Sequence, residues 1–137
     1  MSNSILKIKD LSITLPKNAD RQFAVEDVNL EVHKGEILCV VGESGSGKSV
    51  MTSAILNEVP GSLNITSGSI EFDNQDILKL PQKELNELRG ARISMIYQEP
   101  MAALNPSIRV GKQVDEVFAL HRPEIKATDR RTETLKL

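Results

Sequence analysis

The sequence is poor in cysteine, in long apolar runs and in targeting signals. Cys39 is the single cysteine, so no internal disulfide can form, and its place in an apolar run predicts a small core residue. No apolar run approaches the roughly 18 residues of a membrane-spanning helix. Lys7, Lys9 and Asp10 stand where a signal peptide would be apolar. These absences fit a reducing cytoplasm and predict no direct membrane insertion, so any membrane association would require a partner.

The chain also lacks an excess of positive charge. Its 17 Lys and Arg residues are outnumbered by 19 Asp and Glu, which leaves a net charge of −2. No basic surface is therefore expected, and we predict no nucleic-acid partner. With 137 residues, of which 39% are hydrophobic and 26% charged, the chain has the size and composition of one soluble domain with a real core.

One stretch of the sequence has the pattern of a phosphate-binding loop, G-x-x-x-x-G-K-[ST]. It consists of Gly42, Glu43, Ser44, Gly45, Ser46, Gly47, Lys48 and Ser49. Glycines allow turns that a Cβ would block, so that successive backbone N–H groups can surround phosphate oxygens. Lys48 can reach the β- and γ-phosphates, and the Ser49 hydroxyl can bind Mg²⁺. We therefore predict that these eight residues bind a nucleotide.

The surroundings of this loop support the prediction. Residues 37–41 form a short apolar run typical of a buried strand, and Met51, Ala54 and Ile55 recur at helical spacing. A strand, a glycine loop and a helix in this order are the context that the motif requires, because the start of the helix favours an anion. The alternative interpretation, a Gly/Ser-rich linker that matches by chance, is disfavoured by this context.

Periodicity predicts the remaining elements. Apolar residues that alternate or cluster predict strands over 5–15, 23–32, 67–72 and 91–97. Helical spacing and end signals predict helices over 48–59, 81–88, 110–118 and from 128 onward. Two antiparallel strands that lead into a buried strand make the chain richer in β-structure than a plain doubly wound sheet.

A second motif narrows the class of protein. Gln98-Glu99-Pro100, at the end of the predicted strand over 91–97, resembles the Q-loop of ATP-binding cassette (ABC) ATPases. The stretch that continues through Asn105-Pro106 to Gln113 resembles the branch that imports oligopeptides, dipeptides and nickel. The resemblance implies an α/β P-loop NTPase fold of the ABC ATPase type, present in part. The parts implied are an antiparallel β-subdomain and the start of both the parallel core and the helical subdomain.

The same resemblance implies a division of the chain and a function. Residues 1–97 would be the N-terminal part of the nucleotide-binding core, and 98–137 the Q-loop with the beginning of a truncated helical subdomain. The function implied is that of an ATP-binding subunit that energises import of peptides or a related small solute, nickel included, by binding and hydrolysing ATP. Its implied partners are membrane-spanning permease subunits and a second ATP-binding subunit. Its implied location is peripheral, at the cytoplasmic face of the plasma (inner) membrane, or cytoplasmic if isolated.

The resemblance to ABC ATPases also implies roles for particular residues. ATP and Mg²⁺ are the implied cofactors; Lys48 and Gln98 would be catalytic, and Ser49 and Gln98 would hold Mg²⁺. A neutral amide suits this role because it coordinates through oxygen and does not titrate. The alternative for Gln98 is a polar residue that ends a strand.

Leu15 stands where the family has an aromatic residue that stacks on adenine, and Phe23, expected to pack in the β-subdomain, is the alternative.

Other family motifs are missing from the sequence. It contains no LSGGQ-type signature, no apolar strand ending in Asp-Glu (Walker B) and no switch histidine, since His33 precedes the loop and His121 closes a predicted helix. We therefore expect the N-terminal part of an ABC ATPase domain, inactive in hydrolysis by itself. Two alternatives remain: a nucleotide-binding or interaction module without catalysis, and a different P-loop enzyme such as a kinase or GTPase. The Q-loop context and the lack of an N-K-x-D motif argue against the second.

Overall fold

The computed structural model describes residues 4–137, apart from the side chains of Pro100 and Ala102. The chain forms two compact units, of which the first ends at Leu85 and the second begins at Asn86. The predicted division at 97/98 refers to the subdomains of a whole cassette and stays a prediction. No helix in the described residues is long and apolar enough to cross a membrane.

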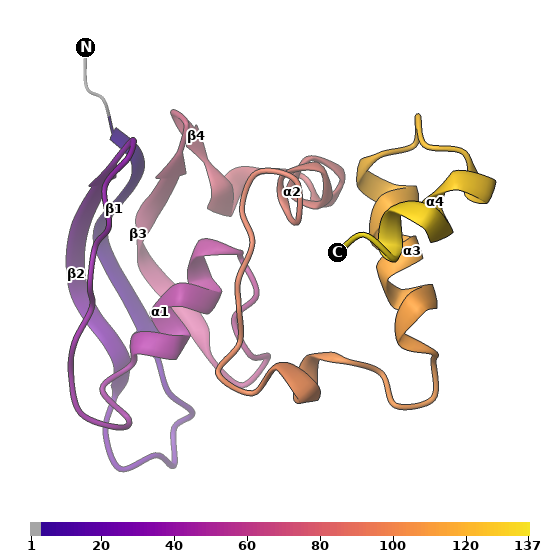
Figure 1. The fold of residues 1–137 in the computed structure, drawn as a ribbon. Helices are drawn as coiled ribbons and strands as arrows, with labels where there is room; N and C mark the ends of the chain where they lie inside the picture. Colours follow the sequence, from indigo (N-terminus) through magenta and orange to yellow (C-terminus); the bar gives the residue numbers. More distant parts are fainter. Residues whose placement is uncertain (1–3) are drawn as a thin grey trace. The chain divides into compact units, whose positions relative to one another are not determined.

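The first unit is built on an antiparallel sheet (Figure 1). Its strands are β1 (Ser4–Thr14), β2 (Phe23–His33), β3 (Asn64–Phe72) and β4 (Gln75–Asp76), in the order β2-β1-β3-β4. The predicted strands over 5–15 and 23–32 are confirmed, and the one predicted over 67–72 begins earlier, at Asn64. Asp73 and Asn74 join β3 to β4 with φ of 49° and 65°, the conformation of the two-residue turns that suit the twist of a hairpin.

A bulge crosses the three long strands of the sheet. Asp10 has φ 48°, and its N–H is satisfied by the Asn29 side chain at 3.0 Å. On the other side of β1, Gly68 of β3 has φ 94° and lies so close that a Cβ there would be 2.5 Å from the Lys9 carbonyl oxygen. A glycine at position 68 is therefore required both by its backbone conformation and by the closeness of β1.

Helix α1 (Lys48–Ile55) covers one face of this sheet (Figure 1). It is shorter than the predicted 48–59, because Asn57 takes a left-handed conformation with φ 51° and ends the helix before the Pro60-Gly61 signal. The buried hydrophobic residues are Ile8, Leu11, Ile13, Ala24, Val25, Met51, Ala54, Leu56, Ile70, Phe72, Ile77 and Leu85. Each large side chain in this core contributes about 1.5–3 kcal/mol by leaving water.

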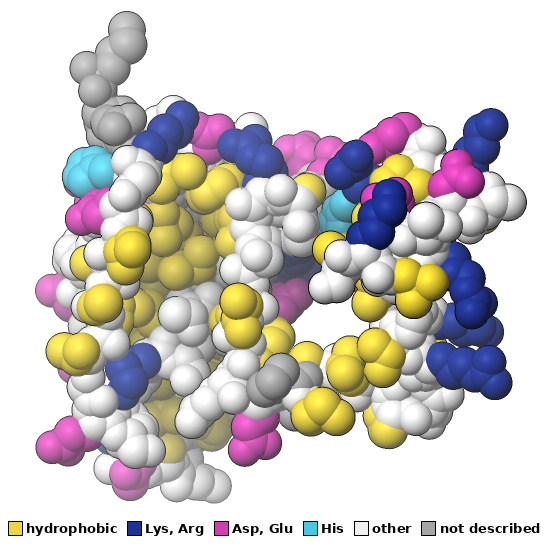
Figure 2. All heavy atoms as spheres, viewed as in Figure 1, with side chains coloured by type: hydrophobic (Ala, Val, Ile, Leu, Met, Phe, Trp, Pro, Cys, Tyr) yellow, Lys and Arg dark blue, Asp and Glu magenta, His cyan; other side chains and the backbone are white. Residues whose placement is uncertain are grey.

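The predicted buried strand over 37–41 is wrong. The segment forms no strand and pairs with no described strand, and Ile37 and Val41 are 90% and 89% exposed. Figure 2 shows hydrophobic side chains at the surface along this part of the first unit. An apolar run becomes a buried strand only when strands pair with its edges and layers cover its faces, and the described residues supply neither. Cys39 is accordingly exposed, so its prediction as a core residue is also wrong.

The second unit is helical. After α2 (Gln82–Leu88), which spans the boundary between the units, come the short 3₁₀ turn η2 (Pro100–Ala103), α3 (Val110–His121) and α4 (Ala127–Thr134). These helices confirm the predictions over 81–88, 110–118 and from 128. The predicted strand over 91–97 is wrong, because its one ladder contact is a single bridge between Arg89 and Ile93, and Ile96 is 95% exposed. The cause is the same as for 37–41: no described strand pairs with its edge.

The glycine at the bulge allows a test of this sheet. We expect Gly68→Ala to lower the free energy of unfolding by about 2 kcal/mol or more, because the new Cβ meets the backbone of β1 and the φ is strained. Gly61→Ala is the matched control, since a Cβ at Gly61 meets nothing within 4 Å and should change stability little. Urea unfolding measures both, and equal stabilities of the two variants would contradict the bulge geometry.

Candidate phosphate-binding site

The glycine-rich loop lies between the 37–41 segment and α1, where the sequence predicts it. Gly45 and Gly47 have φ of 78° and 91°, the left-handed region that glycine enters without strain. Gly47 is the N-cap of α1, and its carbonyl accepts the Met51 N–H at 2.9 Å. The first N–H groups of any helix lack intrahelical acceptors, and they are the donors that anions bind at a helix start. Left-handed glycines and a helix start are thus both present in the loop, as the phosphate-loop motif requires.

The end of the loop rests directly on β2. A Cβ at Gly47 would lie 2.1 Å from the Ala24 carbonyl oxygen and 3.1 Å from a methyl carbon of Val25. Ala24 and Val25 are both buried, so neither has room to move. Gly47 is therefore needed for a close approach as well as for its φ, and this approach places the start of α1 against the sheet.

The ammonium group of Lys48 lies over the loop. It donates to the carbonyl oxygens of Gly42 and Glu43, each at 2.6 Å, and to the Ser46 hydroxyl at 3.1 Å. These contacts use all three donors of the group. They are made to neutral acceptors on an exposed surface, whereas phosphate oxygens would give stronger charge-assisted bonds. A phosphate placed on the loop therefore meets a cation that is already in position.

A second cation contacts the loop, and sequence reasoning missed it. Arg21, in the connection between β1 and β2, donates a hydrogen bond to the Gly45 carbonyl. The two residues are 24 positions apart, and no local pattern links them. Only the pairing of β1 with β2, which places their connection beside the loop, would have revealed the contact.

The predicted Mg²⁺ ligands are divided between the two units. Ser49 is exposed in the first turn of α1, at the end of the loop, and its role as a hydroxyl ligand of Mg²⁺ stays a prediction. Gln98 is an exposed residue in a bend of the second unit, just before η2, and its approach to the loop stays a prediction. In the described part of the chain, no group of three or more His, Cys, Asp and Glu residues forms a metal cage.

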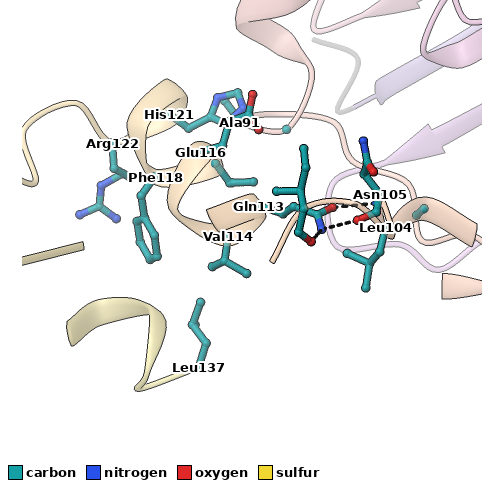
Figure 3. A pocket seen from close by; sticks show the side chains of 14 residues that line it. Ala91, Leu104, Asn105, Gln113, Val114, Glu116, Phe118, His121, Arg122 and Leu137 are labelled. Carbon is teal, nitrogen blue, oxygen red and sulfur yellow. Dashed lines mark hydrogen bonds between the residues drawn. The ribbon is translucent and has the colours of Figure 1, made fainter. Parts of the chain in front are cut away.

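The second unit contains a cavity of its own, of about 900 Å³ (Figure 3). Gln113 on α3 lies beside it and makes three hydrogen bonds: it accepts from the Asn105 N–H at 2.9 Å and donates to the carbonyls of Asn105 and Ile108. His121, at the end of α3, lies against Gly90, where a Cβ would be 2.6 Å from its Nε2 atom. Gln113 therefore holds the 105–108 turn onto α3, and His121 has a packing role.

Comparison with known proteins agrees with these observations. Residues 25–136 match the protein family described as ABC transporter. The oligopeptide transport ATP-binding protein OppD of Escherichia coli is 44% identical over 126 residues, covering 92% of this chain and 37% of that protein. The dipeptide transport ATP-binding protein DppD of Bacillus subtilis is 39% identical over 128 residues, covering 93% of this chain and 38% of that protein.

A solved structure has the same fold. The ATP-binding cassette MJ0796, solved as a dimer in a post-hydrolysis state with ADP and Pi, superposes with a TM-score of 0.77. Its sequence is 25% identical, and the match covers 96% of this chain and 54% of that one. The chain thus spans less than half the length of the OppD and DppD relatives and about half of the solved cassette. The fold class predicted from the sequence, an ABC-type P-loop NTPase present in part, is confirmed, and the chain belongs to the ABC transporter family.

Proposed function

We propose that this protein binds Mg·ATP on the loop from Gly42 to Ser49, as an ATP-binding subunit of a peptide importer. The observation that carries the proposal is the Lys48 ammonium, which lies over a glycine loop at the start of α1. The loop conformation and the cation together form an anion site of nucleotide-binding type. The importer branch is supported by relatives named for oligopeptide and dipeptide transport.

Each site residue has a distinct task in this proposal. The backbone of residues 42–47 surrounds the phosphates, and Lys48 exchanges its carbonyl acceptors for β- and γ-phosphate oxygens. Ser49 supplies a hydroxyl to Mg²⁺, which when bound neutralises charge on the phosphates. Gln98 supplies an amide oxygen toward the metal and the attacking water, and it connects the core to the helical unit. Glu43, Ser44 and Ser46 shape the loop through their backbone and side chains.

The proposed partners follow from the relatives. The solved cassette is dimeric, which supports a second ATP-binding subunit as partner, identical or different. The transport names of OppD and DppD support membrane-spanning permease subunits and a peripheral place at the cytoplasmic face of the membrane. Peptides are the solute class that these names favour, and nickel is the related alternative from the branch resemblance.

The division of work between Lys48 and Gln98 is testable. We expect Lys48→Ala to weaken Mg·ATP binding at least tenfold, about 1.4 kcal/mol, because it removes a charge that contacts phosphate in the ground state. We expect Gln98→Ala to leave binding within a few-fold, because water replaces a neutral amide oxygen on Mg²⁺. Titration with labelled ATP measures both, and Lys34→Ala, an exposed lysine in the turn after β2, is the control. Equal losses for Gln98→Ala and Lys48→Ala would show that Gln98 belongs to the binding site itself.

We also propose that this chain alone binds ATP without turning it over. Its sequence contains no apolar strand ending in the Asp-Glu pair that would hold Mg²⁺ and orient water. The expected result is binding of labelled ATP with no steady release of phosphate above a protein-free blank. Continuous phosphate release that Lys48→Ala abolishes would contradict this proposal.

A further inference from the structure

The net charge of −2 conceals a local excess of positive charge in the second unit. Residues 86–137 contain nine Lys and Arg against seven Asp and Glu, whereas residues 1–85 contain eight against twelve. Figure 2 shows Lys and Arg side chains gathered on the surface around α3 and α4. Both helices belong to the second unit and pack on each other. The positive charge is therefore concentrated on one pair of helices.

A cleft of about 410 Å³ lies between these two helices, and its volume is in the range of small-molecule sites. Three cations line it: Arg109 and Lys112 at the start of α3, and Arg131 on α4. Within the described residues, none of these three side chains makes a hydrogen bond or an ion pair, unlike Lys136, which pairs with Glu133. Like charges that line one space repel each other, so an anion placed there would be stabilised by all three.

The start of α3 carries charge of the unfavourable sign. Its N-cap residue, Arg109, makes no side-chain cap bond, and its first turn contains no acidic residue. The first N–H groups of a helix lack intrahelical acceptors and carry partial positive charge, so an acid or a cap stabilises them and a cation does not. Gly111 puts no side chain over this helix start, and a Cβ there would meet nothing within 4 Å. An anion in the cleft would supply the missing negative charge.

Two further polar groups that line the cleft also lack partners within the described residues. The Thr134 hydroxyl oxygen is buried without a hydrogen bond, which in a native protein indicates a missing ligand or water. Asp115, one turn after Gly111, is half-buried and makes no hydrogen bond or ion pair. A carboxylate only accepts hydrogen bonds, so Asp115 repels a bare anion and favours one that carries a proton. Hydrogen phosphate has such a proton, and sulfate has none.

We propose that the cleft between α3 and α4 binds a protonated phosphate group, either free phosphate or a phosphate monoester. Arg109 and Arg131 offer planar donor groups that match two phosphate oxygens, and Lys112 adds a third cation. Asp115 accepts the P–OH proton, and the N–H groups at the start of α3 complete the site. The cleft and the loop from Gly42 to Ser49 belong to different units, so this proposal does not depend on nucleotide binding at the loop.

Amide NMR of the full chain separates the two sites, because the Gly111 N–H reports on the cleft and the Gly45 N–H on the loop. At about pH 6, roughly half of a phosphate monoester keeps its proton. Inorganic phosphate and glycerol phosphate should each shift the Gly111 signal saturably, and sulfate should bind there at least about tenfold more weakly. Arg131→Gln should weaken phosphate binding at the cleft about tenfold and leave the Gly45 response unchanged. Lys126→Gln, an exposed N-cap lysine of α4 outside the cleft, is the matched control.

A second variant separates loss of binding from loss of folding. Gly111→Glu places a carboxylate at the start of α3, where it should keep or raise the melting temperature. The same carboxylate should occupy the cations, so phosphate should no longer shift the Lys112 N–H signal. A lower melting temperature together with intact phosphate binding would contradict both expectations.

Vesicles decide the source of the phosphate. Binding to phosphatidic acid in phosphatidylcholine vesicles, absent with phosphatidylcholine alone and abolished by Gly111→Glu, would assign a lipid phosphate. Binding of inorganic phosphate and glycerol phosphate without vesicle binding would assign a free ligand. The proposal is overturned if neither phosphate nor these vesicles bind at the cleft, if sulfate binds as well as phosphate, or if Arg131→Gln behaves like Lys126→Gln.

Discussion

The close approach of Gly47 to the Ala24 carbonyl is the contact on which the rest of the site depends. It joins the start of α1 to β2 where a Cβ would lie 2.1 Å from a backbone oxygen that is itself held in the sheet. Because α1 begins there, the Lys48 ammonium comes to lie over the loop, and Ser49 occupies the first helical turn. Arg21 and the start of β2 lie beside the same loop, so the antiparallel sheet forms one side of the candidate phosphate site.

The parts of the fold that were predicted correctly depend on local pattern. The alternation in β1 and β2 and the helical spacing in α3 are properties of neighbouring residues, and the structure confirms them. The strands predicted over 37–41 and 91–97 failed because a buried parallel strand is defined by its neighbours. Their apolar composition is real, but no strand within the described residues pairs with their edges.

The residues of the candidate site differ in how far the sequence alone could predict them. Residues Gly42 to Ser49 were proposed because the motif itself encodes a loop conformation, and the φ values of Gly45 and Gly47 agree with that conformation. Arg21 had no local signal, since its contact with Gly45 depends on strand pairing. Phe23 was expected to pack in the β-subdomain; it is half-buried at the start of β2 and lines a cavity together with Gly42 and Lys48.

A comparison of two loop glycines tests the central role of the Gly47 contact most directly. Gly45 and Gly47 both have left-handed φ, of 78° and 91°, but a Cβ at Gly45 meets nothing within 4 Å. Alanine at either position therefore introduces similar backbone strain, and only Gly47→Ala also forces the loop away from β2. Calorimetric titration should show that Gly47→Ala loses Mg·ATP affinity at least about tenfold more than Gly45→Ala. Equal losses in the two variants would show that strain, and not contact with β2, governs the site.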